Sequence, residues 1–146
     1  STIAQFTALA VLLPVVAGQS GNTGAQALAG TMRGLALREI GISQWLRVAR
    51  KGVGAAFVNG VSIAILTALG VLVWSSSLGL AMVIGLSMVI AMVSAAFSGA
   101  IIPVILSSMG QDPAQSSSII LTTVTDVVGF FSFLGLATLL SSLLES

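Results

Sequence analysis

Asp126 is the strongest candidate for a chemical role in this sequence, because it is a carboxylate inside a long apolar run. It lies fourteen positions after Asp112, which is roughly 20 Å along a helix at about 1.5 Å per residue. That places it near the middle of a hydrocarbon core about 30 Å thick. A carboxylate at that depth costs on the order of 2.5–3.5 kcal/mol. We therefore expect Asp126 to face a partner, a water-filled cavity or an ion.

Polar and small residues share the face of the predicted helix that carries Asp126. Helical spacing places on one stripe Gln115, Ile119, Thr122, Asp126, Gly129 and Phe133. Ser118 and Thr125 flank this stripe. The face is polar around the aspartate and narrow at Gly129, which is typical of a water-filled pathway. The alternative is a structural aspartate that is protonated, or paired with Arg33 or with a neighbouring amide.

A second polar segment interrupts the first apolar run, from Gly18 to Gln26. Polar or irregular structure at membrane depth is tolerated where it lines a cavity or is buried in protein. Asn22 and Gln26 are four positions apart and share a helix face. Their amide oxygens suit a hydrated cation, so we expect both to line the pathway. The alternative is a packing motif of small residues with buried amides.

The available ligands are all oxygen atoms, because the chain contains no His and no Cys. Zinc, copper and haem therefore have no ordinary site, whereas Mg²⁺, Ca²⁺ and alkali ions are suited. Mg²⁺ usually keeps several waters and is held by one or two carboxylates. One carboxylate neutralises half of a divalent charge, and two copies of Asp126 across a two-fold axis neutralise all of it. This favours a homodimer with the pathway on its axis.

Enzymatic functions are poorly supported, and we expect the protein not to be an enzyme. The segment Gly18-Gln19-Ser20-Gly21 superficially matches a serine-protease element, but the chain has no His to act as general base. A di-aspartyl intramembrane protease needs two facing aspartates, and Asp112 is predicted at a helix start, far from Asp126.

The composition identifies the solvent as lipid. Hydrophobic residues make up 56% of the 146 residues, charged residues 6%, and the mean hydropathy is +1.13. A soluble domain carries about 25% charged residues. The net charge of +1 is too small to indicate a nucleic-acid partner. We therefore predict one all-α domain over residues 1–146, a polytopic transmembrane helix bundle in the lipid bilayer.

Charge-free runs divide the chain into four predicted spans, at about 5–32, 53–74, 78–107 and 113–143. Trp74 and the three serines after it mark the break in the long central run. Asp112-Pro113 reads as an N-cap followed by proline at the first helical position. Pro14 and Pro103 fall inside spans and are expected to kink them.

All five Lys and Arg residues lie between the first two spans. The positive-inside rule predicts that the 33–51 loop is cytoplasmic in a multi-pass cell-membrane protein, with both ends outside. The residues around Trp45 to Lys51 suit a short interfacial helix, and a basic hairpin is the alternative.

Three stretches resemble the MgtE family of magnesium channels and its transporter relatives. The first runs from Leu13 to Gln26 and the second from Arg33 to Ile40. The third comprises Asp112-Pro113 and the segment from Thr122 to Phe130. With the order of the spans they cover nearly the whole chain, and the combination is specific although each stretch alone is weak.

The resemblance implies a Mg²⁺-selective pore between two identical subunits, with Mg²⁺ as both ligand and transported ion. In that family, the last helix and the helix with the Gly-Asn-x-Gly motif line the pore. The aspartate that corresponds to Asp126 would hold hydrated Mg²⁺, and Thr122 would assist through its backbone carbonyl. Asn22 would line the same pathway.

The chain departs from the family pattern in several places. Ala25 stands where a second Asn is frequent, and Ser20 stands where Gly is frequent. The family's pore domain typically has five helices, against four here, and a cytosolic regulatory part with paired CBS domains is absent. The chain is then either a shortened member or a relative without a regulator.

The sequence thus predicts a magnesium channel or transporter with its pathway at a dimer interface. One alternative is an ion-coupled divalent cation exchanger, in which uptake saturates and depends on Na⁺ or pH. An alternative of another class is a non-transporting membrane scaffold, which would give no Mg²⁺ flux in vesicles.

Overall fold

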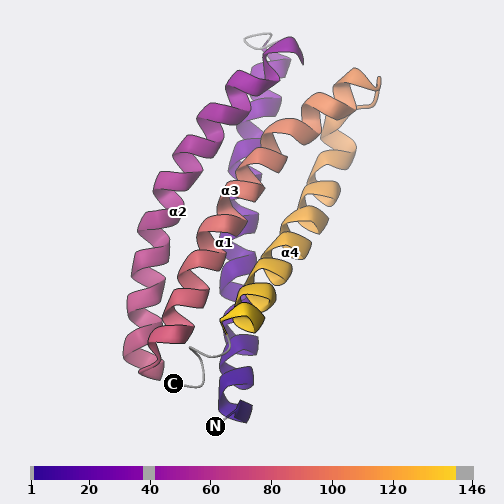
Figure 1. The fold of residues 1–146 in the computed structure, drawn as a ribbon. Coiled ribbons are helices and arrows are strands. Elements are labelled where there is room, and N and C mark those ends of the chain that lie inside the picture. Colours follow the sequence, from indigo (N-terminus) through magenta and orange to yellow (C-terminus); the bar gives the residue numbers. More distant parts are fainter. Residues whose placement is uncertain (1, 38–41, 141–146) are drawn as a thin grey trace.

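A computed structural model describes residues 2–37 and 42–140 as a helical bundle (Figure 1). Arg38, Glu39 and Ile40, which belong to the second family-like stretch, lie outside these ranges. The elements, in chain order, are α1 (Thr2–Ala36), the short 3₁₀ helix η1 (Ile42–Gln44), α2 (Trp45–Ser75), α3 (Leu78–Ser108) and α4 (Pro113–Leu139). Strands do not occur in the described ranges, so the predicted all-helical fold class is confirmed.

Three helices in the described part of the chain are long and apolar enough to cross a membrane. Their apolar segments are Leu46–Ser75, Leu78–Ser108 and Ser116–Leu139. They correspond to the second, third and fourth predicted spans, although residues 141–143 of the last one lie outside the description. The first predicted span coincides with part of α1, which is one unbroken helix. That α1 crosses a membrane stays a prediction.

The basic segment is helical as expected, but it is not a separate interfacial helix or a hairpin. Residues 45–51 form the first two turns of α2 and continue directly into its apolar part. The physical reason is that this segment contains no proline and consists largely of good helix formers, including Leu46, Arg47 and Ala49. Once the turn is nucleated, propagation into the apolar run is favourable.

Serine residues end α2 and start α3, as the predicted break requires. Ser76 adopts a left-handed conformation with φ of 56°, and its N–H donates to the carbonyl of Leu72 over 2.8 Å. Ser77 caps α3, because its hydroxyl oxygen accepts from the N–H of Leu80 at 3.2 Å. The α3–α4 turn uses Gly110, whose φ of 76° favours glycine.

Helix boundaries also agree with the proline positions. Pro113 is the first residue of α4, where its missing N–H leaves no bond unmade. Pro14 and Pro103 lie inside α1 and α3, and both helices continue past them. The kinks expected at these two prolines stay predictions.

The central element is α3, which packs against α1, α2 and α4. Buried residues recur along α3 from Gly79 to Val104, so this helix has the largest buried share of its apolar segment. By contrast, α2 packs almost solely on α3, while α1 also contacts α4. Figure 1 shows that the start of α2 and the α3–α4 turn lie at the same end of the bundle.

Candidate functional site

One face of α4 is buried in the bundle at intervals of four residues. Its members are Ser117, Leu121, Thr125, Gly129, Phe133 and Ala137. The residues that follow the first three, Ser118, Thr122 and Asp126, form a neighbouring polar row that opens outward. Ser118 and Thr122 are exposed and Asp126 is half-buried. Packing of the buried face thus fixes the direction in which this polar row points.

The polar row lines an open cavity of about 300 Å³ on the outer side of α4. Its lining residues are Ser118, Ile119, Thr122, Thr123 and Asp126. Within residues 2–37 and 42–140, the Asp126 carboxylate forms neither a hydrogen bond nor an ion pair, and Arg33 does not reach it. The carboxylate is therefore open to a ligand from outside the chain.

Threonine and serine oxygens surround the carboxylate with further acceptors. The hydroxyl of Thr122 donates to the carbonyl of Ser118 at 2.7 Å, and that of Thr123 donates to Ile119 at 3.0 Å. Because each hydroxyl proton is directed to the helix backbone, the oxygen lone pairs remain free to accept. The cavity is consequently rich in acceptors and suits a hydrated cation, whose water ligands donate.

Thr125 is buried and does not line this cavity. Its hydroxyl donates to the backbone carbonyl of Thr122 at 3.0 Å. Thr125 thus contacts the same carbonyl that the family resemblance assigns to ion binding. Inside α4 this carbonyl also accepts the helical N–H of Asp126. Both of its lone pairs are therefore used, and a water ligand would replace the Thr125 hydroxyl.

Gly24 and Gly129, one glycine from each polar segment, serve helix packing, whereas a Cβ atom at Gly18 or Gly21 would meet nothing within 4 Å. A Cβ atom at Gly24 would lie 3.3 Å from the side chains of Leu121 and Thr125, and one at Gly129 would lie 3.7 Å from Ser20 and Val16. Gly129 is therefore in the α1–α4 contact and not beside the open cavity. Small residues at such positions allow two helix backbones to approach closely.

The amides of α1 point away from these contacts, since Asn22 and Gln26 are both exposed. The single chain therefore does not bring the α1 amides and the Asp126 carboxylate into one described cavity. The side chain of Gln115, the first member of the predicted stripe, lies outside the description. Ser20 and Thr23 direct their hydroxyls to the carbonyls of Ala17 and Gln19 in their own helix.

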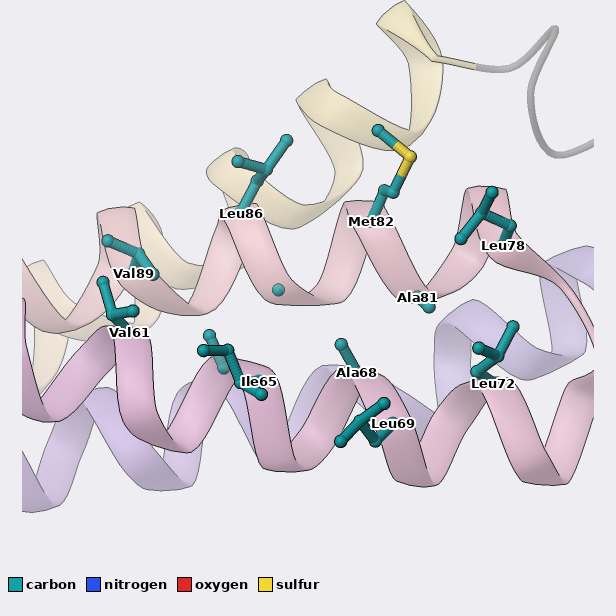
Figure 2. Close-up of a pocket in the computed structure, with 12 residues that line it drawn as sticks. Val61, Ile65, Ala68, Leu69, Leu72, Leu78, Ala81, Met82, Leu86 and Val89 are labelled. Carbon is teal, nitrogen blue, oxygen red and sulfur yellow. The ribbon is translucent and has the colours of Figure 1, made fainter.

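The groove between α2 and α3 has no ligand for an ion. It has a volume of about 460 Å³ and is lined by apolar side chains and Gly85 alone (Figure 2). Among the residues that the structure describes, no three His, Cys, Asp or Glu side chains gather in one place. The cavity at Asp126 therefore supplies one carboxylate per chain, which suits a cation that keeps most of its water.

Sequence reasoning found Asp126, Thr122 and Ser118 but missed Thr123, which lines the same cavity. It also missed that Gly24 lies against Thr125. A signal was present in both cases. Thr123 lies three residues before Asp126, one helical turn away, and Gly24 belongs to a run of small residues at helix-contact spacing.

Comparison with known proteins matches residues 13–136 to the family model MgtE, described as a divalent cation transporter. A magnesium transporter MgtE from Thermus thermophilus is 35% identical over 140 residues, which cover 96% of this chain. Proteins of the same name from Bacillus subtilis and Enterococcus faecalis are 32% and 30% identical over 92% and 95% of it. The chain spans about a third of these relatives' length, at 31%, 30% and 31% respectively.

Proposed function

Because the chain belongs to the MgtE family of divalent cation transporters, we propose that it conducts hydrated Mg²⁺ across a membrane. The observation that carries this proposal is the half-buried carboxylate of Asp126. It lies unpaired among the described residues, in an oxygen-lined cavity on a helix that is apolar enough to span a membrane. Ionisable groups in such positions mark ion pathways.

Mg²⁺ would be bound through its water ligands. The ion gives up water reluctantly, so outer-sphere hydrogen bonds are the available contacts. Its waters would donate to the carboxylate of Asp126, to the carbonyl of Thr122 and to the hydroxyl oxygen of Ser118. Rings of carboxylates select cations in channels by the same electrostatic attraction. The ion would follow its electrochemical gradient.

The pathway would lie between two copies of the chain. One Asp126 carboxylate balances half of the charge of Mg²⁺, and a symmetry-related copy supplies the rest. Two features support this arrangement: the cavity opens to the outside of the bundle, and Asn22 and Gln26 are exposed on α1. A second copy that covers these surfaces would enclose the cavity and add amide oxygens to its wall.

The proposed topology is multi-pass, with the basic start of α2 on the cytoplasmic side. The end of α1, which carries Arg33, and the start of α2, which carries Arg47, Arg50 and Lys51, lie at the end of the bundle that also holds the α3–α4 turn (Figure 1). The positive-inside rule supports a cytoplasmic location for this end. The two other ends, at the start of α1 and at the α2–α3 connection, would face outward.

The test is Mg²⁺ influx into proteoliposomes, followed with an internal Mg²⁺ dye. Asp126→Asn removes the charge with almost no change of shape, and we expect it to abolish influx. Ser62→Ala is the matched control on an exposed face of α2, and we expect it to retain influx. Wild-type influx in Asp126→Asn would overturn the proposal.

The same vesicles distinguish the rival functions. Influx that saturates and requires a Na⁺ or pH gradient would replace the channel by an ion-coupled exchanger. Absence of Mg²⁺ influx with the unmodified protein would favour the third function, a non-transporting membrane scaffold.

A further inference from the structure

We propose that the first two turns of α2 bind the headgroup of an anionic phospholipid through Arg47, Arg50 and Lys51. This inference is independent of the proposed ion pathway and requires only that α2 lies in a membrane. It follows from the spacing of the three cations, their depth in the bilayer and the surface below them.

The three cations form one exposed cluster. At 100° per residue, spacings of three and four place Arg47, Arg50 and Lys51 within an arc of about 100° on the helix. All three side chains are exposed, whereas Ala49 between them is buried in the bundle. The cluster therefore lies on the side of α2 that faces away from its packing partner α3.

The length of α2 places this cluster in the headgroup layer. The helix has 31 residues, or roughly 46 Å at about 1.5 Å per residue, against about 40–45 Å for a bilayer with its headgroups. Lys51 and Trp74 are 23 positions apart, roughly 35 Å, close to the approximately 30 Å hydrocarbon core. Trp74 is exposed at the far end, where aromatic residues anchor helices.

An apolar stripe continues below the cations on the same side of the helix. Val58, Ile65 and Leu69 lie within about 40° of Arg47 around the helix axis. Their side chains are 64%, 56% and 57% exposed. Ile65 and Leu69 also line the open groove between α2 and α3 (Figure 2). A lipid whose phosphate contacts the cations would thus find an apolar surface for its acyl chains.

The chemistry of the cluster favours phosphate as the bound group. Arginine binds phosphate oxygens in a bidentate manner, and two arginines with a lysine present several donors in a small area. An acidic peptide would also be attracted, but it would have to be delivered to this depth. Anionic headgroups are already present there, and a polybasic juxtamembrane segment attracts them.

The test measures the thermal unfolding midpoint of the full chain in neutral detergent during titration with phosphatidylglycerol or phosphatidylcholine. We expect a saturable rise with phosphatidylglycerol alone. Each Lys or Arg near the surface contributes roughly fivefold in affinity. The triple variant Arg47→Gln, Arg50→Gln, Lys51→Gln should therefore bind on the order of 100-fold more weakly.

Arg33→Gln is the matched control, because Arg33 is an exposed cation at the same end of the bundle but on α1. We expect it to weaken phosphatidylglycerol binding by no more than the loss of one charge does, roughly fivefold. Equal responses to both lipids, an unchanged response in the triple variant, or an equal rise with polyglutamate at matched charge would each overturn the inference. If the triple variant does not fold, the retention of phosphatidylglycerol in native mass spectra is compared between Lys51→Gln and the unmodified protein. Equal retention would overturn the inference.

Discussion

Asp126 and Thr122 lie one helical turn apart in the same cavity, but they would contact a hydrated ion in different ways. The carboxylate contributes a charge that none of the other cavity residues carries. Thr122 has two oxygens, and its hydroxyl proton is directed to the carbonyl of Ser118 at 2.7 Å. In the proposed mechanism the carbonyl of Thr122, and not its hydroxyl, accepts from the ion's water.

Thr122→Val tests this distinction between hydroxyl and carbonyl. Valine keeps the shape and the backbone carbonyl but removes the hydroxyl, so we expect Mg²⁺ influx close to that of the wild type. Asp126→Asn in the same assay should be inactive. Loss of influx in Thr122→Val, in protein that retains its thermal unfolding midpoint, would assign the contact to the hydroxyl.

At the scale of the elements, a close crossing of α1 and α3 holds the site in place. A Cβ atom at Gly99 of α3 would lie 2.5 Å from the carbonyl oxygen of Gly24 and 3.0 Å from the backbone nitrogen of Leu28. These are backbone atoms, which cannot turn aside as a flexible side chain can. Since Gly24 also lies against Thr125 of α4, this crossing determines how α4 meets α1.

Gly99→Ala should therefore lower the free energy of unfolding by about 1–3 kcal/mol, because the added methyl group forces the two helices apart. Gly85→Ala is the control in the same helix, where a Cβ atom would lie 3.7 Å from Ala68, an ordinary contact. Because alanine has a better helix propensity than glycine, Gly85→Ala should leave the free energy of unfolding unchanged or raise it by up to about 1 kcal/mol. Thermal unfolding in detergent compares the two, and equal midpoints would contradict the crossing.

At the scale of the whole molecule, the proposed ion pathway requires more than a single bundle. The groups assigned to the pathway are on the outside: the cavity with Asp126 opens away from the core, and the exposed amides of α1 contact no part of that cavity. Water-filled routes through membranes are enclosed by protein. In the proposed dimer, a second copy would supply the enclosing wall and the second negative charge.

A single cysteine on the polar row tests the proposed dimer, and the native chain has no cysteine to interfere. In membranes, Ser118→Cys should give covalent dimers with an oxidant or a short bis-thiol linker, because symmetry brings this row near its own copy. Ser62→Cys on α2, also exposed, should remain monomeric. Equal cross-linking at both positions, or none at position 118, would contradict a two-fold axis beside α4.

Much of the fold follows from local features of the sequence. The serine-rich break after Trp74 and the proline at the start of α4 were predictable, because caps and proline positions depend on a few neighbouring residues. Continuity of α2 through its basic start was not predicted. Charge patterns indicate where a helix leaves the hydrocarbon, but they do not end a helix that lacks a breaker.

For the site, the sequence by itself determined the chemistry: one carboxylate deep in an apolar helix, with hydroxyls at turn spacing and no softer ligand. Only the tertiary structure decided which residues of the stripe and its flanks face outward. Thr125 and Gly129 turn into the bundle while Thr122 and Asp126 remain accessible. The reason is that the buried face of α4 drifts around the helix as it crosses its neighbours, and the crossing depends on contacts between residues far apart in sequence, such as Gly24 and Gly99.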